Sequence, residues 1–370
     1  MRELLAEGRR VVPTGESEGQ GRGSHRGGRA HVHRRIGGAI RRQQMVWLFN
    51  RRFTSWMADR SLRSQLPVPY RWFGGYCRAW AVLTRWSWVP LGKQAFFIAV
   101  WLNRLFGGPR EIFLRIHHAE IGLTLGDPRM LKVVHEALPG SDETAILAAV
   151  LSAGDSFIDV GANHGSYSVA ACRIVGRAGF VVAAEAQPGL AALVEETLRR
   201  SAPCRWHVYA GAVADRRSSA PFFVLRRNSG ESSFFRGPST AGVHTATTVP
   251  VERLDDAIPW RDLPGRTVVK LDVEGAECMV LDGARELVAS LRPVLLLEVN
   301  PAAMSAANVA WQGLLARLLD LGYDRFSETG NPGDAMPLES LDPDRHRDIV
   351  VLPGVSADPR RAAAPMSPTP

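Results

Sequence analysis

The chain has 370 residues, of which 45% are hydrophobic, so it can form one large domain with extensions or two modest domains. Its formal net charge is +8, but the excess is almost all arginine, since lysine occurs only at Lys93, Lys132 and Lys270. This arginine bias, with abundant Ala, Gly and Pro, indicates a coding bias, so the charge is no sign of a nucleic-acid partner. The four cysteines form no CxxC pair and no histidine cluster accompanies them, which argues against a structural zinc and a disulfide framework and favours a reducing cytoplasm.

The first third of the chain predicts two segments outside the main domain. Residues 1–44 are rich in Gly, Arg, Ser and His without apolar periodicity, which is typical of a disordered basic arm. Residues 45–125 are expected to form a helical extension dense in tryptophan. Its most apolar stretch, "QAFFIAVWLNRLF", is shorter than the ~20 residues that span a bilayer and is bracketed by Lys93 and Arg104. Two alternatives stay open for residues 45–106, packing on the main domain or peripheral contact with a membrane surface.

From about residue 141 the pattern predicts alternating helices and strands. The SDET sequence at 141–144 indicates the start of a helix, which runs through "AILAAVL". Apolar runs predict strands at 156–160, 180–184, 206–213, 267–273, 293–299 and 347–352. Helical periodicity predicts helices at 166–175, 188–200, 276–291 and 309–322, and the alternating residues of 220–251 predict a β-rich excursion.

This order predicts the fold class and the boundaries of the main domain. Strands that alternate with helices indicate an α/β fold, doubly wound, with a mostly parallel seven-stranded sheet covered on both faces. We place this domain at residues 126–354 and expect a disordered tail at 355–370.

The stretch "FIDVGANHGSYS" is the first candidate binding loop. It carries an acid at the strand end, Asp159, followed by Gly161 and Gly165 in a G-x-x-x-G spacing. A dinucleotide pyrophosphate favours the tighter G-x-G-x-x-G turn, so this loop suits a ligand without phosphates and with a positive centre. Glu185 ends the next strand, where an acid can accept hydrogen bonds from two ribose hydroxyls. S-adenosylmethionine combines a ribose, an amino acid and a sulfonium cation.

The stretch "VVKLDVEGAECMVLDGARE" is the second candidate site. Its strand brings Asp272, Glu274 and Glu277 to one rim, with Lys270 two residues before Asp272 on the same face, and Glu298 ends the following strand. Charges that gather at a rim are costly unless they have partners there. No ligand spacing demands a metal.

The motifs "FIDVGANHGSYS", "AAEAQP", "VPVERLDD", "VVKLDVEGAECMVLDGA" and "PVLLLEVNP" together resemble the FkbM-type family of S-adenosylmethionine-dependent methyltransferases over residues 140–353. The resemblance implies the class I methyltransferase fold and O-methylation of a hydroxyl on a sugar, glycan or secondary metabolite. It also implies S-adenosylmethionine as cofactor, held by Asp159, Gly161, Ala162, Asn163, Gly165, Tyr167, Ser168, Glu185, Ala186 and Asp272. His164 departs from the apolar residue common at its position in the family, and nothing carries over to residues before about 125.

Removal of the acceptor proton is the step that the sequence assigns least firmly. Asp272 is the first candidate base and Glu298 the second, with Lys270 as the partner that keeps the acid ionised. Two other functions stay open, a weak or inactive methyltransferase-like module at a membrane surface and a nicotinamide-dependent oxidoreductase. A nucleic-acid methyltransferase is disfavoured, because its Asn/Asp-Pro-Pro-aromatic element is replaced here by "LDVEG".

Overall fold

The computed structural model describes residues 55–84, 91–225, 228–235, 244–329 and 334–354. The predicted basic arm and C-terminal tail lie outside these residues, and the predicted domain boundaries stay predictions.

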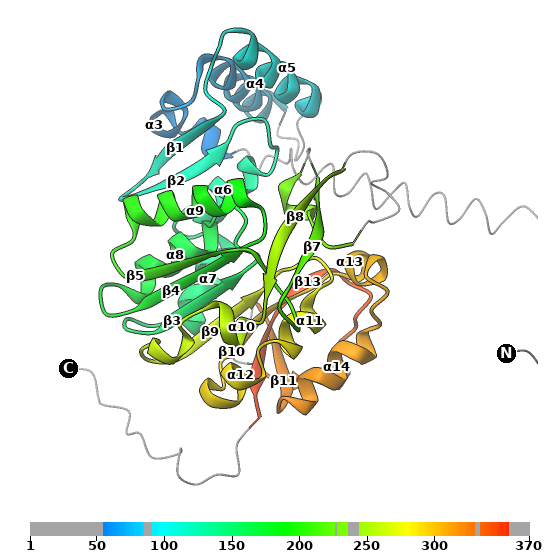
Figure 1. Cartoon of the computed structure of the whole chain (residues 1–370). Coiled ribbons are helices and arrows are strands. Elements are labelled where there is room, and N and C mark those ends of the chain that lie inside the picture. Colours follow the sequence, from blue (N-terminus) through cyan, green and yellow to red (C-terminus); the bar gives the residue numbers. More distant parts are fainter. Residues whose placement is uncertain (1–54, 85–90, 226–227, 236–243, 330–333, 355–370) are drawn as a thin grey trace, which may run out of the picture. The chain divides into compact units, whose positions relative to one another are not determined.

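The main sheet confirms the predicted doubly wound α/β fold (Figure 1). Its strands are β3 (Ser156–Val160), β4 (Phe180–Glu185), β5 (Arg205–Ala210), β9 (Thr267–Leu271), β10 (Val294–Val299), β11 (Tyr323–Glu328), β12 (Met336–Pro337) and β13 (Arg347–Pro353). They lie in the order β12-β11-β13-β10-β9-β3-β4-β5. The five strands from β10 to β5 are parallel, whereas β13 runs antiparallel between β10 and β11. Six of these strands lie at predicted runs, the unpredicted β11 brings the sheet to the expected seven, and the two-residue β12 adds an eighth at the edge.

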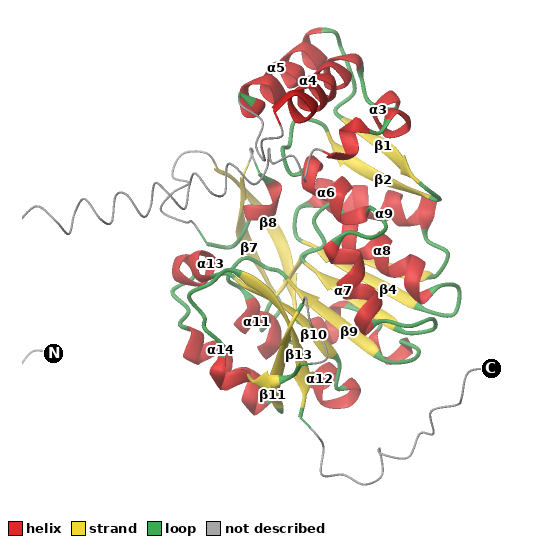
Figure 2. Ribbon diagram, turned by 180° about the vertical axis from the view of Figure 1, so that it is seen from behind, coloured by secondary structure: helices red, strands yellow, loops and turns green. Residues whose placement is uncertain are grey.

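Both faces of this sheet are covered, because its central strands carry apolar side chains on each side. Phe157 and Val181 point to one core, and Ile158 and Val182 to the other. The first core is shared with α7 (Asp142–Val150), α8 (Ser166–Val175) and α9 (Pro188–Ser201). The second is covered by α10 (Leu254–Ala257), α11 (Glu277–Asp282), α12 (Arg285–Leu291), α13 (Pro301–Ala306) and α14 (Trp311–Asp320), as Figure 2 shows from behind.

The single helix predicted at 276–291 is wrong, because two helices occupy this stretch. They are α11 and α12, which Gly283 separates. A Cβ on Gly283 would lie 2.0 Å from the carbonyl oxygen of Ala214, so the backbone of another segment presses against the chain here. Local periodicity cannot report such a contact.

The predicted β-rich excursion is a separate three-stranded sheet. It contains β6 (Ala212–Val213), β7 (Ser218–Leu225) and β8 (His244–Glu252) in the order β6-β8-β7. The strand expected at 206–213 is therefore divided at Gly211 between two sheets. A Cβ on Gly211 would lie 2.8 Å from the Tyr209 ring and 2.9 Å from the carbonyl oxygen of Pro250, so only glycine fits at this change of direction.

The extension contains helices, as expected, and a hairpin that the sequence did not predict. The helices are α3 (Arg60–Ser64), α4 (Val68–Thr84) and α5 (Gly92–Leu105), and a 3₁₀ turn, η1, covers Ser55–Ala58. The hairpin is β1 (Glu111–Ile116) with β2 (Ala119–Thr124), and α6 (Met130–Ala137) follows it. These elements share an apolar core that includes Tyr70, Phe73 and Phe96.

The hairpin forms hydrogen bonds between the extension and α9 of the main domain. The Gly122 N–H donates to Thr197 Oγ1 at 2.9 Å, and the Glu120 N–H donates to Ser201 Oγ at 2.6 Å. A Cβ on Gly122 would lie 2.5 Å from Leu193, so β2 approaches α9 closely. Among the described residues, no helix is both long and apolar enough to cross a membrane.

Candidate functional site

The glycine loop between β3 and α8 folds as its sequence requires. Gly161 and Gly165 have φ of +83° and +77°, a backbone region that glycine enters without strain. A Cβ on Gly161 would lie only 1.9 Å from the carbonyl oxygen of Asp272, so the loop after β3 touches the backbone that follows β9. The two candidate stretches of the sequence therefore meet at one edge of the sheet, where parallel strands end.

Asn163 joins this loop to its neighbours. Its φ of +53° is a left-handed conformation that asparagine tolerates better than most residues. Its N–H donates to Glu185 Oε2 at 2.7 Å, and its Nδ2 donates to Ser229 Oγ at 3.1 Å. Ser229 opens the turn η2 (Ser229–Glu231), so Asn163 connects the glycine loop to β4 and to this turn.

Glu185 lies buried at the end of β4 and is held by the backbone on both oxygens. Its Oε1 accepts from the Gln187 N–H at 2.8 Å, and its Oε2 accepts from Asn163. Burial raises the pKa of this carboxyl to about 7, against the opposing effect of the two N–H donors. A carboxylate accepts about four hydrogen bonds. Each oxygen of Glu185 can therefore still accept a hydrogen bond from one of two ribose hydroxyls. Ala186 and Phe234 pack against a small apolar cluster formed by β6, β7 and β8.

Asp159 lies behind the loop, fully buried. Its Oδ2 accepts from Ser168 Oγ at 2.7 Å, whereas its Oδ1 has no hydrogen-bond partner in the part of the chain that the structure describes. Lys270 Nζ lies 3.9 Å from this Oδ1 and 2.8 Å from Asp272 Oδ2, and it stands 4.8 Å from the centre of the Tyr167 ring. The predicted pairing of Lys270 with Asp272 is therefore confirmed, and Lys270 also faces Asp159.

The acidic rim consists of Asp272, Glu274 and Glu298, which each place one carboxylate oxygen within 4.8 Å of the others. Burial raises the pKa of Asp272, but the charge of Lys270 and its hydrogen bond outweigh this effect and leave the pKa below its usual value. Burial raises the pKa of Glu298 to about 7, and the nearby Asp272 adds to this rise. Burial and the charge of Glu298 raise the pKa of Glu274 well above its usual value.

Glu298 lies beside a histidine and keeps one oxygen without a hydrogen-bond partner in the described part of the chain. His346 Nε2 lies 2.8 Å from Glu298 Oε1, whereas Glu298 Oε2 has no partner among the described residues. Glu298 also borders a small hollow at the ends of β9 and β10. Its lining is mixed, with carboxylates, one ammonium group and apolar side chains: Ile146, Tyr167, Lys270, Leu271, Asp272, Leu296, Glu298, Thr329 and Asp348.

The loop of residues 228–235 lies against both candidate stretches. Ser229 O accepts from Gln187 Nε2 at 3.2 Å, and Ser233 Oγ donates to the carbonyl oxygen of Glu274 at 2.7 Å. Residues 228–235 therefore run from the glycine loop to the acidic rim. The remaining positions of the candidate site, Ala162 and Gly165, belong to the same turn, in which the Gly165 N–H donates to the carbonyl oxygen of Ala162.

His164 cannot exchange a proton near neutral pH. It is fully buried, its Nδ1 lies 2.6 Å from Asn163 Oδ1, and its Nε2 accepts from the Thr124 N–H at 3.4 Å. This arrangement fits a neutral ring that donates from Nδ1. Burial lowers its pKa to about 4, so it serves as a structural bridge between the hairpin and the glycine loop.

A buried ion pair beside the site was missed by the sequence reasoning. Arg129 donates to both oxygens of Glu136 at 2.8 and 3.3 Å, and Lys132 Nζ lies 3.3 Å from the same carboxylate. Ser166, the first residue of α8, donates to Glu136 Oε2 at 2.5 Å. Burial alone would raise the pKa of Glu136, but Arg129 and Lys132 lower it strongly. The pair thereby anchors the start of α8, and no sequence motif marks it.

His346 and Asp348 were missed for a topological reason. They lie at the start of β13, which runs antiparallel to β10 and pairs Asp348 with Glu298. The beginning of an antiparallel strand therefore joins the ends of the parallel ones. An apolar run does not show whether its strand is parallel or antiparallel to its neighbours. The polar sequence "DRHRD" directly before the run was the only local sign that charged residues gather there.

Comparison with known proteins finds one matching family model. Residues 159–325 match the family model of the methyltransferase FkbM domain. No curated protein sequence matches the chain. Three solved structures are similar at low identity. The methyltransferase FkbM of Methylobacillus flagellatus KT has a TM-score of 0.35 and 15% identity, over 61% of this chain and 54% of that one. An S-adenosylmethionine-dependent O-methyltransferase of Thermotoga maritima has a TM-score of 0.32 and 14% identity, over 70% and 83% of the two chains, and Aeropyrum pernix fibrillarin with bound S-adenosylmethionine has a TM-score of 0.32 and 13% identity, over 56% and 72%. The chain spans about half the length of the first. At these TM-scores nothing about function is drawn from the three structures.

Proposed function

We propose that the chain binds S-adenosylmethionine and transfers its methyl group to a hydroxyl of a sugar, glycan or secondary metabolite, because residues 159–325 match the family model of the methyltransferase FkbM domain. One observation carries the proposal. A buried carboxylate, Glu185, accepts a hydrogen bond from a glycine loop with the spacing G-x-x-x-G, which lacks the G-x-G-x-x-G turn of dinucleotide-binding loops. The pair suits a ribose and a ligand of positive charge better than it suits a pyrophosphate.

The residues present fit this cofactor in three respects. Glu185 has acceptor capacity left for the two ribose hydroxyls. Asp159 Oδ1 is a buried acceptor without a hydrogen-bond partner among the described residues, and it lies directly under the loop. Gly161 lets the loop after β3 approach the backbone at Asp272, which brings the two candidate stretches to one site. When bound, the sulfonium supplies an electrophilic methyl group.

The chain's own part in the transfer is alignment and removal of a proton. Alignment of an acceptor with the methyl can contribute ~7–11 kcal/mol, and a positioned base a further ~10²–10⁴-fold. We assign the base to Glu298, in preference to Asp272. Glu298 has a free oxygen and a pKa of about 7, whereas Asp272 is bound to Lys270 and has a lowered pKa. Glu298 Oε2 would accept the O–H proton of the acceptor, while the bound cofactor would supply the methyl group through cleavage of its S–CH₃ bond and keep the sulfur as a neutral thioether.

Asp272 is then a positioning residue at the rim. Its ion pair with Lys270 neutralises one charge of the acidic rim, which would otherwise hold three carboxylates without a cation. We predict that Asp272→Asn abolishes turnover and leaves folding largely intact. Turnover at the wild-type rate in this variant would remove Asp272 from the proposed site.

Calorimetric titration with S-adenosylmethionine and with NADH tests the cofactor. We expect binding of the first alone. Glu185→Ala should weaken it about 100-fold, because two hydrogen bonds to a charged acceptor are lost. Glu195→Ala, which removes an exposed carboxylate of α9, is the matched control. Wild-type affinity in Glu185→Ala, or binding of NADH, would contradict the proposal.

The acceptor can be identified by mass spectrometry of cell extracts with and without the protein. A mass difference of 14 daltons on a glycan or secondary metabolite is the expected result.

The proposed cytoplasmic location is supported by the four cysteines, all of which are buried free thiols.

A further inference from the structure

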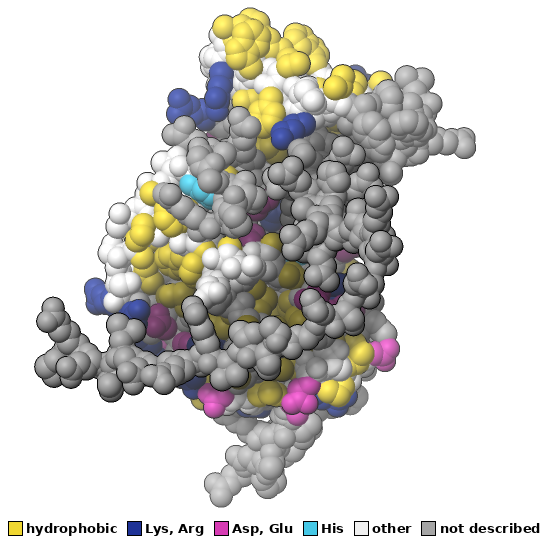
Figure 3. Space-filling view, turned by 90° about the vertical axis from the view of Figure 1, so that its right-hand side faces the viewer, with side chains coloured by type: hydrophobic (Ala, Val, Ile, Leu, Met, Phe, Trp, Pro, Cys, Tyr) yellow, Lys and Arg dark blue, Asp and Glu magenta, His cyan; other side chains and the backbone are white. Residues whose placement is uncertain are grey.

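The helices α4 and α5 expose large apolar side chains. Of the nine large hydrophobic residues that are exposed among the described residues, seven lie on or next to these two helices. We call six of them the outer helical face: Trp72, Leu91, Ile98, Trp101, Leu105 and Phe106. The exposed fractions of Trp72, Trp101 and Phe106 are 62%, 60% and 72%. Figure 3 shows hydrophobic side chains gathered at the end of the molecule that α4 and α5 occupy in Figure 1.

These side chains are not needed for the core of the extension. On α5 the core is reached by Phe96 and Val100, and Phe96 packs edge-on against Tyr70 and Phe73 of α4. At about 100° per residue, Ile98, Trp101 and Leu105 lie roughly 140–200° around the helix from Phe96. The helix is therefore apolar on two opposite faces, and only one of them is buried. An apolar surface of this kind marks a site of contact.

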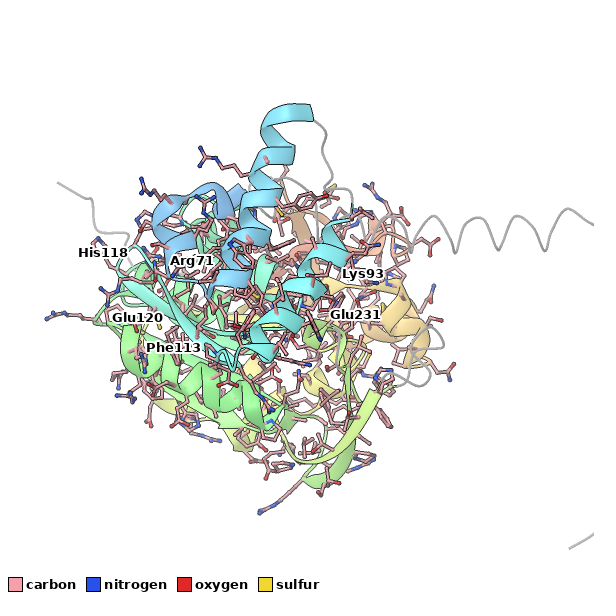
Figure 4. All side chains as sticks on the ribbon, turned by 90° about the horizontal axis from the view of Figure 1, so that it is seen from above. Arg71, Lys93, Phe113, His118, Glu120 and Glu231 are labelled. Atoms are coloured by element: carbon pink, nitrogen blue, oxygen red, sulfur yellow. The ribbon has the colours of Figure 1, made fainter. Side chains whose placement is uncertain are left out.

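The segment that carries this face is mostly basic. Between residues 59 and 108 the described residues carry six basic side chains and one acid. The acid, Asp59, is used within the chain, because it caps α3 by accepting from the N–H groups of Ser61 and Leu62. Figure 4 shows Arg71 and Lys93 on the two sides of the helical pair, and Arg104 is exposed in the last turn of α5.

We propose that the outer helical face binds the surface of a membrane that contains anionic lipids. Tryptophan and long aliphatic side chains with basic residues at their borders are the composition of helices that lie in the headgroup region. The basic side chains complement anionic headgroups, each contributing to attraction within a Debye length of the surface. A protein partner of matching chemistry would have to be acidic, and it would leave the indole N–H groups of the tryptophans without the interfacial water that suits them.

Sedimentation of the full chain with lipid vesicles tests this proposal. We expect the chain to sediment with vesicles that mix phosphatidylcholine and phosphatidylglycerol, and far less with phosphatidylcholine alone. The triple variant Ile98→Ser, Trp101→Ser, Leu105→Ser should lower the partition coefficient at least tenfold, because it removes three apolar side chains from the contact. The double variant Lys93→Gln, Arg104→Gln should weaken binding mainly at low salt.

The control variant is Leu319→Ser with Met336→Ser, which removes the two exposed hydrophobic side chains outside the helical pair. It should bind vesicles as the wild type does. Thermal unfolding and affinity for S-adenosylmethionine should stay unchanged in all these variants. These two measurements separate a failure of the membrane proposal from a failure of the proposed activity.

Three results would overturn the proposal. The first is a wild-type chain that does not sediment with anionic vesicles. The second is a triple variant that binds as tightly as the wild type, which would assign the binding to another segment such as the arginine-rich residues 1–54. The third is a wild-type dimer in sedimentation velocity that the triple variant dissociates, which would make the outer helical face an interface between two copies.

Discussion

Replacement of Gly161 by alanine gives a sharp test of the contact between the two halves of the site. A Cβ at this position would lie 1.9 Å from the carbonyl oxygen of Asp272. Real contacts of this kind are not closer than 3.0 Å, so one backbone segment must move by about 1 Å. The φ of +83° adds roughly 1–2 kcal/mol for any residue with a Cβ. With about 1–3 kcal/mol for the overlap, we expect Gly161→Ala to lower the free energy of unfolding by roughly 2–5 kcal/mol.

Gly140→Ala separates the two contributions. Gly140 has a similar φ of +80°, but a Cβ there would have no heavy atom within 4 Å. This control should therefore show the cost of the backbone conformation alone, and it should leave the site intact. Urea unfolding measures both variants, and calorimetry measures their affinity for S-adenosylmethionine.

The affinity should distinguish the variants most clearly. A displacement of 1 Å in a binding site can cost about 10²-fold, so we expect a loss of that order in Gly161→Ala and no loss in Gly140→Ala. If the two variants lose equal stability and both keep wild-type affinity, the close approach of the glycine loop to Asp272 has no role in the site.

Three further predictions concern buried charges. Glu298→Gln should lower kcat by about 10²–10⁴-fold, and the wild-type kcat should rise with pH through about 7 as Glu298 loses its proton, a rise that steady-state assays should not find in the variant. Lys270→Met should lower the free energy of unfolding by about 3–5 kcal/mol in urea titrations, because the buried Asp159 and the half-buried Asp272 lose their cation. The pKa of Glu136 is lowered in the folded chain. Its contribution to stability is therefore present above about pH 4.5, the pKa of the unfolded chain, and is lost as the pH falls below that value. Glu136→Gln should make the free energy of unfolding less dependent on pH in this acid range.

Glu195→Gln, at an exposed position of α9, serves as the control for both glutamate variants. A pH profile of kcat that Glu298→Gln leaves in place would return the role of base to Asp272. A loss below about 1 kcal/mol in Lys270→Met would show that the two aspartates are solvated or protonated without their lysine. An unchanged pH dependence in this acid range in Glu136→Gln would mean that other carboxyls set it.

The parts of the site that the sequence predicted are those that lie next to a strand end. Asp159, Gly161 and Glu185 each follow or end an apolar run, and the carboxyl ends of parallel strands meet at one edge. Periodicity locates such runs, and topology then places the polar residues together. The pairing of Lys270 with Asp272 followed from the same rule, because residues two apart share a face of a strand.

The parts that it did not predict depend on contacts between distant segments. The break at Gly283 comes from the Ala214 backbone, and the ion pair of Arg129 with Glu136 lies on a helix without a motif. His346 reaches Glu298 only because β13 is antiparallel, a direction that no local pattern contains. The order of the two candidate bases also needed the structure, since burial and partners decide which carboxyl keeps a pKa near neutrality.

The two backbone bonds to Glu185 have a consequence for how a ligand enters. The free chain already holds the amides of Asn163 and Gln187 on one carboxylate. The turn is thus preorganised, and little conformational entropy remains to be lost when the nucleoside arrives. Association should accordingly follow a single bimolecular phase in stopped-flow traces, and both amides should exchange slowly with deuterium before the ligand is added as well as after.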